Sequence, residues 1–246
     1  MQAIILAAGF GSRLRPLTDN MPKCLTEVNG VPLLVNELQI LENCGVGETI
    51  IVLGHMREKI INSIGFQMKN MKITYIENTI YRDTNNVYSL YLTKDYIHED
   101  VLMTECDLFY HEETIREMLL GDADCNILVS PFNVNTMDGT VVKVEADQSV
   151  TSLVIGKRQS PDFNYASMMK TVNVYRFKRD FFVNQFMPTI ELYVHTQQVK
   201  SYYELVLGSL IYYNNATFHA VTVDESQWAE IDDIEDLRKA EAKFNR

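Results

Sequence analysis

A short apolar run followed by a glycine-containing loop constrains the fold of this chain most strongly. Residues Ala3–Leu6 are apolar and are followed closely by Gly9, which is typical of a strand inside a parallel sheet. The leucines of 33–41 then recur at helical spacing, and Thr49–Leu53 predicts a second strand. A strand, a loop, a helix and a further strand in this order need a right-handed crossover, so the sequence predicts a parallel sheet.

The rest of the chain continues this alternation and then changes character. Further strands are predicted at 73–76, 101–104 and 126–130, with helices at 87–96 and 114–120. Closely spaced strands at 141–144, 152–155 and 171–175 indicate an antiparallel region, and helices at 179–186, 202–213 and 234–244 accompany a strand at 217–223. We therefore expect an α/β fold with an open, mostly parallel, Rossmann-like twisted sheet, helices on both faces and a smaller antiparallel elaboration in the second half. No linker or repeat divides the chain, which predicts a single domain over 1–246.

The charge balance limits the partners that this chain can bind. Its 246 residues include 22 Lys plus Arg and 33 Asp plus Glu, a formal net charge of −11. An acidic surface without a basic stripe opposes binding to nucleic acid and to anionic lipid. Any small anionic substrate must instead meet a few well-placed cations, backbone N–H groups or a metal ion.

The cysteines and the hydropathy pattern indicate a cytoplasmic protein. The four cysteines are scattered without a C-x-x-C pair, which suits reduced thiols in a reducing compartment. The chain starts without a basic leader, and no stretch approaches the roughly 18 apolar residues of a membrane span. The five histidines lack the spacing of metal ligands, so we expect structural or solvated roles for them.

The loop Gly9-Phe10-Gly11-Ser12-Arg13 predicts a phosphate-binding site. A dinucleotide-binding loop would carry a third glycine and start a helix at once, whereas Leu14 stands at that position. A P-loop is excluded because no G-K-[ST] follows. Two glycines let the backbone approach a phosphate chain, and Arg13, Arg15 and Lys23 can neutralise it. The alternative is a solvated surface loop.

This loop also carries a family resemblance. The run from Leu6 to Thr18, together with Met21-Pro22-Lys23-Cys24-Leu25, closely resembles the signature loop of the sugar-phosphate-type nucleotidyltransferases. The resemblance implies that the backbone around Leu6, Ala8, Gly9 and Gly11 binds the nucleotide. It also implies that Arg13 grips the departing pyrophosphate and that Lys23 lies nearer the α-phosphorus.

Three later segments extend the resemblance and narrow it. The segments 85–92, 170–177 and 228–233 are similar to those of phosphocholine cytidylyltransferases and of their 2-aminoethylphosphonate-using relatives, some of which are fused to an aminotransferase. The chain lacks the glutamine-and-proline base-recognition segment of the sugar enzymes. The resemblance therefore implies CTP and a small zwitterionic phosphonate or phosphate as substrates, with residues 1–135 mainly binding nucleotide and 136–246 mainly binding the acceptor. A homo-oligomer or a fusion to another enzyme module is compatible with it.

Two carboxylates predict a magnesium site. Asp107 follows one apolar strand and Asp232 follows another, and both match the family's metal pair. Mg²⁺ commonly takes one or two protein carboxylates together with phosphate oxygens. A helix cap or a turn is the alternative for Asp107. Asp233 is expected to cap the helix from Ile234, whereas Glu230 alternates with Asp232 and is a second-rank site residue.

Several other polar residues have both a functional and a structural interpretation. Asn85, Asn86 and Ser89 could read cytosine, although such residues at a helix start are also favoured as caps. By resemblance, Lys170 reaches the phosphate that joins nucleotide and acceptor, and Asn173 belongs to the same acceptor segment. A surface lysine at a strand end is the alternative for Lys170.

An acceptor amine would need acidic or aromatic partners. Glu204 and Glu230 could pair with an ammonium group, and tyrosines near 202–213 together with Trp228 could contribute cation–π contacts. The helical spacing of Tyr202, Val206, Leu210 and Tyr213 favours core packing for that stripe.

The sequence therefore predicts a Mg²⁺-dependent cytidylyltransferase. An acceptor phosphate or phosphonate oxygen would attack the α-phosphorus of CTP and release pyrophosphate, without a protein nucleophile. Two alternatives stay open: a hexose 1-phosphate nucleotidyltransferase, and a non-catalytic nucleotide-sensing domain that kept the fold.

Overall fold

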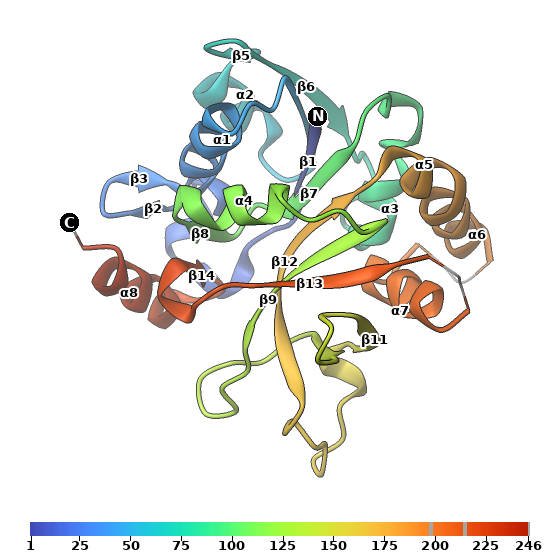
Figure 1. Cartoon of the computed structure of the whole chain (residues 1–246). Helices are drawn as coiled ribbons and strands as arrows, with labels where there is room; N and C mark the ends of the chain where they lie inside the picture. Colours follow the sequence, from blue (N-terminus) through green and yellow to red (C-terminus); the bar gives the residue numbers. More distant parts are fainter. Residues whose placement is uncertain (197–198, 214–215, 246) are drawn as a thin grey trace.

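A mixed sheet forms the centre of the molecule (Figure 1). The computed structural model describes residues 1–196, 199–213 and 216–245, and within these ranges the sheet has ten strands. Its main path has the order β11-β10-β12-β7-β1-β4-β6-β5, and β9 pairs with both β12 and β13. The strands are β1 (Gln2–Ala7), β4 (Glu48–Leu53), β5 (Gln67–Met68), β6 (Met71–Glu77), β7 (Val101–Glu105), β9 (Cys125–Pro131), β10 (Val141–Val144), β11 (Val150–Val154), β12 (Met168–Phe177) and β13 (Phe218–Thr222).

The middle of this sheet is parallel, as the sequence predicted. Strand β1 pairs in parallel with β4 and β7, and β4 pairs in parallel with β6. Alternate side chains of β1 enter different cores: Ile4 joins one hydrophobic cluster and Ile5 the other. Because β1 is buried on both faces, its side chains are apolar at successive positions, which explains the continuous apolar run Ala3–Leu6.

Helices cover both faces of the sheet (Figure 1). On the face of Ile5 lie α1 (Leu33–Asn43), α2 (Arg57–Ile64) and α4 (Glu112–Leu119), which contribute buried residues such as Leu38, Ile60 and Ile115 to the same cluster. On the face of Ile4 lie α3 (Asn86–Tyr91), α5 (Arg179–Phe181), α6 (Met187–Thr196) and α7 (Tyr203–Tyr213). The predicted α/β fold class is confirmed.

A small second sheet lies beside the main one and joins two distant parts of the chain. Strand β8 (Leu108–Tyr110) pairs antiparallel with β14 (Trp228–Glu230), and α8 (Ile234–Lys243) follows β14. A further two-stranded hairpin is formed by β2 (Glu27–Val28) and β3 (Val31–Pro32). A third hydrophobic cluster contains side chains from α8 and β8 together with Leu33, the first residue of α1. This arrangement fixes the segment after β14 against the loop after β7.

The structure departs from the sequence expectations in several elements. The helices α2 and α6 and the strand β8 were not predicted. A strand was expected before Asp232, and β14 confirms it, although it ends at Glu230 and does not include Asp232. The helix expected at 87–96 ends at Tyr91, and a 3₁₀ turn follows at Lys94–Tyr96. The helix expected at 179–186 is one short α-helical segment that continues as a π-helix, Phe182–Phe186.

The predicted tyrosine stripe is partly wrong. Val206 and Leu210 of α7 are buried, but Tyr213 at the end of the helix is 90% exposed and Tyr202 precedes the helix. Trp228 is 4% exposed and packs in a hydrophobic core. The expected cap is confirmed: Asp233 accepts hydrogen bonds from the backbone N–H groups of Glu235 and Asp236.

The cysteines and the helices add two observations. The four cysteines are unpaired. Across the described ranges, none of the helices combines the length and the apolar character that spanning a bilayer requires.

Candidate active site

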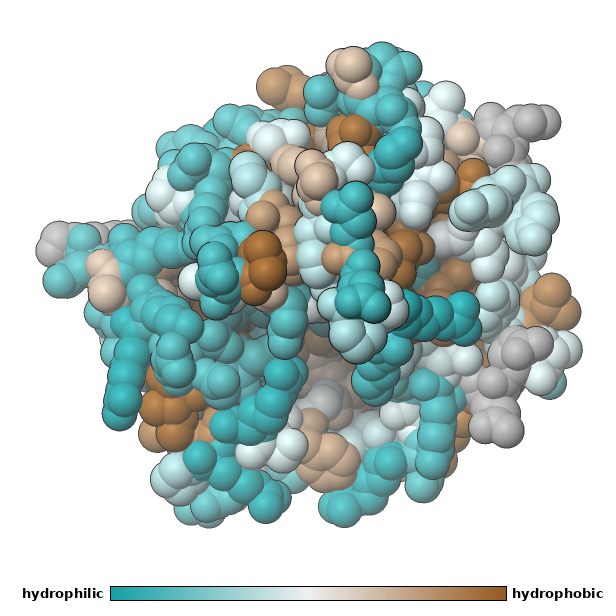
Figure 2. Space-filling view, turned by 90° about the horizontal axis from the view of Figure 1, so that it is seen from below, coloured by the Kyte–Doolittle hydropathy of each residue, from teal (hydrophilic) through white to brown (hydrophobic). Residues whose placement is uncertain are grey.

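A cleft of about 810 Å³ opens at the carboxyl ends of the central parallel strands. Figure 2 looks onto this face and shows a hollow near its centre, bordered largely by hydrophilic side chains. Ligands of open α/β sheets bind at this edge because the strand-to-helix loops converge there. Fifteen predicted site residues line the cleft, namely Leu6, Ala8, Gly9, Gly11, Arg13, Lys23, Asn85, Asn86, Ser89, Asp107, Lys170, Asn173, Glu204, Glu230 and Asp232. Arg15, the third cation considered for phosphate, is exposed and does not line it.

The glycine-rich loop leaves the end of β1 and packs tightly on Lys23. Gly11 has a φ of 61°, a left-handed conformation that favours glycine. A Cβ atom at Gly11 would lie 2.6 Å from the Cβ of Lys23, so no other residue fits without displacing the lysine stem. The hydroxyl of Thr18 donates a hydrogen bond to the Gly11 carbonyl oxygen at 2.8 Å. Gly11 therefore has a structural reason to be glycine beyond phosphate approach.

Aromatic rings attach the tip of the glycine loop to two neighbouring loops. The Phe10 ring lies 4.9 Å from the His55 ring and 5.1 Å from the Tyr81 ring, measured between centroids. The guanidinium carbon of Arg82 lies 5.2 Å from the centroid of Phe10. These contacts, which we call the Phe10 clip, join the loops after β1, β4 and β6 at one end of the cleft.

Two acidic side chains from distant segments meet a lysine at the middle of the cleft. The Lys23 Nζ lies 2.8 Å from Oδ2 of Asp107 and 2.7 Å from Oδ1 of Asp232. Arg13 Nη2 contacts the same Asp232 oxygen at 2.7 Å. Asp107 connects β7 to β8 and Asp232 follows β14, so the pairing of β8 with β14 brings them together.

The charges of this group are mutually stabilising. Burial alone would lower the pKa of Lys23, but the neighbouring Asp107 and Asp232 raise it well above its ordinary value. Burial favours the neutral form of Asp232, yet Lys23 and Arg13 hold the pKa of this carboxyl below its usual range. Lys23 and Asp232 are therefore both charged near neutral pH.

The carboxylate pair suits a divalent metal. Oδ1 of Asp107 is buried and finds no hydrogen-bond partner among the described residues, so one lone-pair-bearing oxygen is available to a cation. Within the described ranges, no cluster of three or more His, Cys, Asp and Glu side chains is placed to hold a metal ion. Two carboxylates completed by phosphate oxygens and water are a common donor set for Mg²⁺, and Asp107 with Asp232 fits that set.

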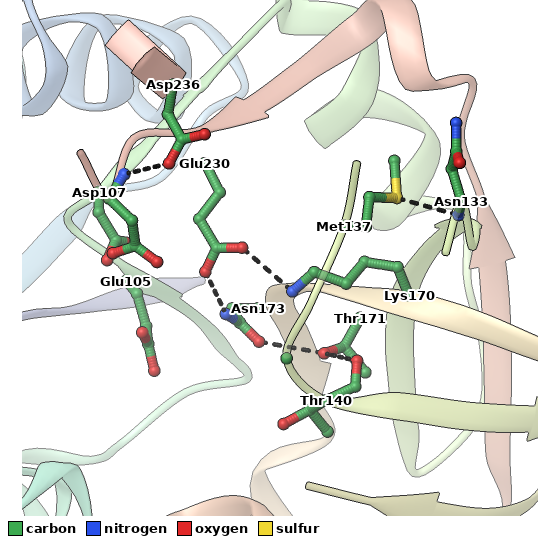
Figure 3. Close-up of polar contacts among 12 residues, drawn as sticks. Glu105, Asp107, Asn133, Met137, Thr140, Lys170, Thr171, Asn173, Glu230 and Asp236 are labelled. Atoms are coloured by element: carbon green, nitrogen blue, oxygen red, sulfur yellow. Dashed lines mark hydrogen bonds and ion pairs between the residues drawn. The ribbon is translucent and has the colours of Figure 1, made fainter. Parts of the chain in front are cut away.

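A buried lysine also lies among polar groups of the cleft (Figure 3). Lys170 is 3% exposed, and its Nζ lies 3.1 Å from Oε2 of Glu230. Asn173 donates to Oε1 of the same Glu230 at 3.3 Å and accepts from the hydroxyl of Thr171 at 3.1 Å. The surface-lysine alternative for Lys170 is thus wrong, because strand β12 buries this side chain beside Glu230.

A backbone irregularity turns Asn173 toward the cleft. Asn173 has a φ of 58°, and the register between β12 and β9 shifts between Thr171 and Tyr175. Left-handed backbone in a non-glycine residue at a bulge is strained, and such bulges often redirect a side chain at a functional site.

A second acidic group, Glu105 and Glu204, lines the same cleft. Asn86 Nδ2 donates to Glu105 Oε1 at 3.3 Å and to Glu204 Oε2 at 3.1 Å, and the Tyr203 hydroxyl donates to Glu105 at 2.8 Å. Burial and the neighbouring carboxylates raise the pKa of Glu105 well above its ordinary range. Burial likewise raises the pKa values of Glu204 and Glu230. A bound cation would stabilise the ionised forms of these carboxyls.

Residues at the start of helix α3 both stabilise the local structure and line the cleft. Asn85 is the N-cap of α3, because its side chain accepts from the backbone N–H of Asn86 at 2.8 Å. Asn86 accepts from the Tyr203 backbone N–H at 3.0 Å, and Ser89 accepts from Asn78 at 3.1 Å. The capping alternative is therefore confirmed for Asn85, while all three side chains still line the cleft.

Sequence reasoning missed several lining residues. Asn78, Tyr81 and Thr84 line the cleft from the loop after β6, and Asp138, Gly139 and Lys157 line it from the antiparallel half. The available signal for Asn78 was its position as a polar residue shortly after the predicted strand at 73–76. Trp228, which was considered for the acceptor pocket, does not line this cleft.

Comparisons with known proteins agree with this geometry. The profile of the MobA-like NTP transferase domain matches residues 3–158. The chain is 30% identical over its full length to the CMP-5′-(3-aminopropyl)phosphonate synthase of Streptomyces rubellomurinus, of which it spans 39%. It is 41% identical over 95 residues, 39% of the chain, to the choline-phosphate cytidylyltransferase of Streptococcus pneumoniae, of which the match spans 40%.

A third relative and a solved structure complete the comparison. The UTP–glucose-1-phosphate uridylyltransferase AglF of Haloferax volcanii is 29% identical over 167 residues, which are 67% of this chain and 68% of that protein. The solved CTP:phosphocholine cytidylyltransferase LicC from Streptococcus pneumoniae superposes with a TM-score of 0.78 at 22% identity, over 98% of this chain and 97% of that one. At this identity the structural match shows a shared fold.

Proposed function

This chain belongs to the MobA-like NTP transferase family, and we propose that it transfers CMP from CTP to a small acceptor that carries a phosphonate or phosphate and an amino group. One observation carries this proposal. A single cleft holds a glycine loop with Arg13 and Lys23 beside the Asp107–Asp232 pair, and also a buried lysine among carboxyls. The first set of residues fits a triphosphate with its metal, and the second fits a zwitterion.

The proposed reaction is an in-line displacement. An oxygen of the acceptor phosphonate attacks the α-phosphorus of CTP, a new P–O bond forms, and the bond to pyrophosphate breaks. Because this oxygen is already ionised near neutral pH, the protein mainly aligns two anions and stabilises charge on the leaving group. Arg13 and Lys23 supply that stabilisation from the triphosphate side, and Lys170 receives the acceptor phosphonate. When bound, Mg²⁺ held by Asp107 and Asp232 would neutralise further phosphate charge.

The buried carboxyls favour an amino group on the acceptor. Burial raises the pKa values of Glu105, Glu204 and Glu230, so a cation is needed to keep these carboxyls ionised, and Lys170 pairs directly with Glu230. An ammonium group can donate to these oxygens with charge-assisted hydrogen bonds. A neutral hexose offers no such compensation, which weighs against the hexose 1-phosphate alternative.

The aromatic residues favour a primary amine over a quaternary one. Among the residues described, Tyr202 is the single aromatic side chain that lines the cleft away from the Phe10 clip. Lys157 already covers it, with Nζ 4.8 Å from the ring centroid and a hydrogen bond to the hydroxyl. A trimethylammonium group has no N–H donors and is usually bound by several rings. We therefore favour a 2-aminoethylphosphonate-like acceptor over phosphocholine.

A substrate matrix tests this function. Pyrophosphate release would be measured with CTP, UTP and dTTP, each against 2-aminoethylphosphonate, phosphocholine and glucose 1-phosphate. We expect the highest kcat/KM with CTP and 2-aminoethylphosphonate. Efficient use of glucose 1-phosphate with UTP or dTTP would overturn the acceptor class, and the absence of pyrophosphate release with every pair would favour a nucleotide-sensing role.

A further inference from the structure

Lys23 occupies the space between the two carboxylates that fit a divalent cation. Its ammonium nitrogen lies 2.8 Å from Asp107 Oδ2 and 2.7 Å from Asp232 Oδ1, and its side chain is only 13% exposed. Arg13 contacts the same Asp232 oxygen at 2.7 Å. The negative charge of the carboxylate pair is thus already compensated by the chain's own cations.

A lysine and a divalent ion cannot share this position. Mg²⁺ lies at about 2.0 to 2.1 Å from its oxygen ligands, so an ion that joined both carboxylates would stand close to the Lys23 ammonium. The Lys23 ammonium and the divalent ion would repel each other strongly at such a distance, because little water screens charges in a partly buried site. One of the two cations must therefore leave.

We propose that Lys23 is a displaceable internal cation, which keeps the divalent-ion site closed until a triphosphate draws its ammonium group away. This inference rests on the proposed binding of a nucleoside triphosphate to the glycine loop. In the nucleotide-free protein Lys23 neutralises Asp107 and Asp232. When the triphosphate binds, the Lys23 ammonium moves to its phosphate oxygens and exposes both carboxylates to the metal ion that accompanies the nucleotide.

The local structure lets the ammonium move while the main chain stays in place. Lys23 begins a 3₁₀ turn, Lys23–Leu25, and its Cβ, Cγ and Cδ lie beside Gly11. The stem therefore lies directly against the loop that is proposed to hold the phosphates. Rotation about the side-chain bonds of Lys23 suffices to transfer Nζ from the carboxylates toward this loop.

Such an exchange would couple two binding events. If a metal ion binds Asp107 and Asp232 only after Lys23 has moved, triphosphate binding raises the affinity for the metal ion. By reciprocity, the metal ion raises the affinity for the triphosphate by the same factor. The acidic cleft would then bind free divalent ions weakly despite its carboxylates. Phosphate oxygens that ligate the ion contribute to this coupling as well, so the part due to Lys23 is measured by the metal affinity of Lys23 variants without nucleotide.

Manganese binding provides a test that needs no turnover. Mn²⁺ favours the same oxygen ligands as Mg²⁺, and its free concentration can be read from its paramagnetic resonance signal. The parent protein would be titrated with Mn²⁺ alone and again with saturating CTP in the absence of acceptor. We expect weak binding without nucleotide and at least tenfold tighter binding with it.

Substitutions at Lys23 isolate the role of the ammonium group. Lys23→Met removes the charge, so Mn²⁺ should bind at least tenfold more tightly than to the parent without nucleotide. Lys23→Arg keeps the charge and should stay as weak as the parent. The double variant Lys23→Met/Asp232→Asn should lose this gain in Mn²⁺ affinity, and that loss would place the ion at the Asp232 carboxylate. Lys23→Gln carries the same expectation if methionine prevents folding.

The outcomes separate this inference from the proposed function. Mn²⁺ binding to a folded Lys23→Met variant that is no tighter than binding to the parent would overturn the displaceable cation. The measurement without nucleotide involves neither CTP nor an acceptor. A gain in Mn²⁺ affinity together with a failed substrate matrix would therefore leave the lysine exchange supported and the proposed reaction refuted.

Discussion

The backbone N–H of Ile231 donates a hydrogen bond to the carbonyl oxygen of Asp107 at 2.9 Å. This bond extends the pairing of β8 with β14 by one step beyond Glu230. It holds two acidic side chains from opposite halves of the chain on either side of Lys23. The small second sheet thus positions the candidate metal site, and the main sheet positions the glycine loop opposite it.

Loss of either carboxylate of this pair should nearly abolish turnover. We expect Asp107→Asn and Asp232→Asn to lower kcat by at least about a hundredfold at saturating Mg²⁺, because a neutral amide is a poor ligand for a hard divalent cation. Steady-state pyrophosphate release and circular dichroism would be measured together. Glu235→Gln on the exposed start of α8 is a matched control that should keep parental activity. Normal turnover by either folded variant would remove that carboxylate from the metal site.

Arg13 should contribute mainly to the transition state. Arg13→Ala is expected to cost about 2.7 to 4 kcal/mol in kcat/KM, the loss associated with one preorganised charge-stabilising donor. Arg15→Ala serves as the control, since Arg15 lies on the same loop and pairs with the exposed Asp19. Equal, severalfold effects of the two substitutions would show that Arg13 contributes only to the general charge of the loop.

Glu230 should distinguish acceptors with and without an amine. We expect Glu230→Gln to raise the KM for 2-aminoethylphosphonate about tenfold, and to change the KM for ethylphosphonate far less, because only the amine loses a charge-assisted contact. Initial rates with both acceptors at saturating CTP would measure this difference. Glu225→Gln, a change to a nearby exposed carboxyl, is the control. Parallel losses with both acceptors would make Glu230 a structural partner of Lys170 and Asn173.

The Phe10 clip should preorganise the glycine loop for the nucleotide. Phe10→Ala removes the ring contacts with His55 and Tyr81, so the loop must be ordered on binding, and the KM for CTP should rise about tenfold. The KM for the acceptor should stay near the parental value. Phe10→Tyr keeps the ring and should restore most of the affinity. If Phe10→Tyr were as impaired as Phe10→Ala, the ring contacts would not explain the effect.

Glu37 should make stability fall as the pH rises. This side chain of α1 is fully buried, and burial raises its pKa to about 8 from an ordinary value of 4.5. Between these two values the folded state retains a proton that the unfolded state has lost, so the free energy of unfolding decreases with rising pH, by up to about 1.4 kcal/mol per unit. Below pH 4.5 this contribution no longer varies.

Comparison with Glu37→Gln isolates this contribution from other titrating groups. Urea unfolding at pH 5, 7 and 9 should show the variant gaining stability relative to the parent as the pH rises. A constant difference between the two proteins over this range would contradict a raised pKa at Glu37.

Local patterns in the sequence were sufficient for the central sheet and for much of the cleft. The apolar run of β1, the leucine spacing of α1 and the glycine loop are short-range signals, because each depends on neighbouring residues. The family resemblance added Lys170 and Asn173, which the structure places at the same cleft as Arg13. A strand as short as β8 has no comparable local pattern, and the mixed polarity of α2 hid that helix.

The sequence alone determined which residue types stand at the ends of the strands, since alternation and turn residues decide where a chain can enter and leave a sheet. Only the tertiary structure decided which of these side chains meet. The contact of Lys23 with Asp107 and Asp232 joins positions 84 and 209 residues apart, and it follows from the pairing of β8 with β14. Likewise, Glu105 at the end of β7 and Glu204 of α7 lie 99 positions apart in the sequence and meet only in the fold, where Asn86 of α3 donates a hydrogen bond to each. Electrostatic energy depends on distance in space and on burial, and neither quantity exists until the chain has folded.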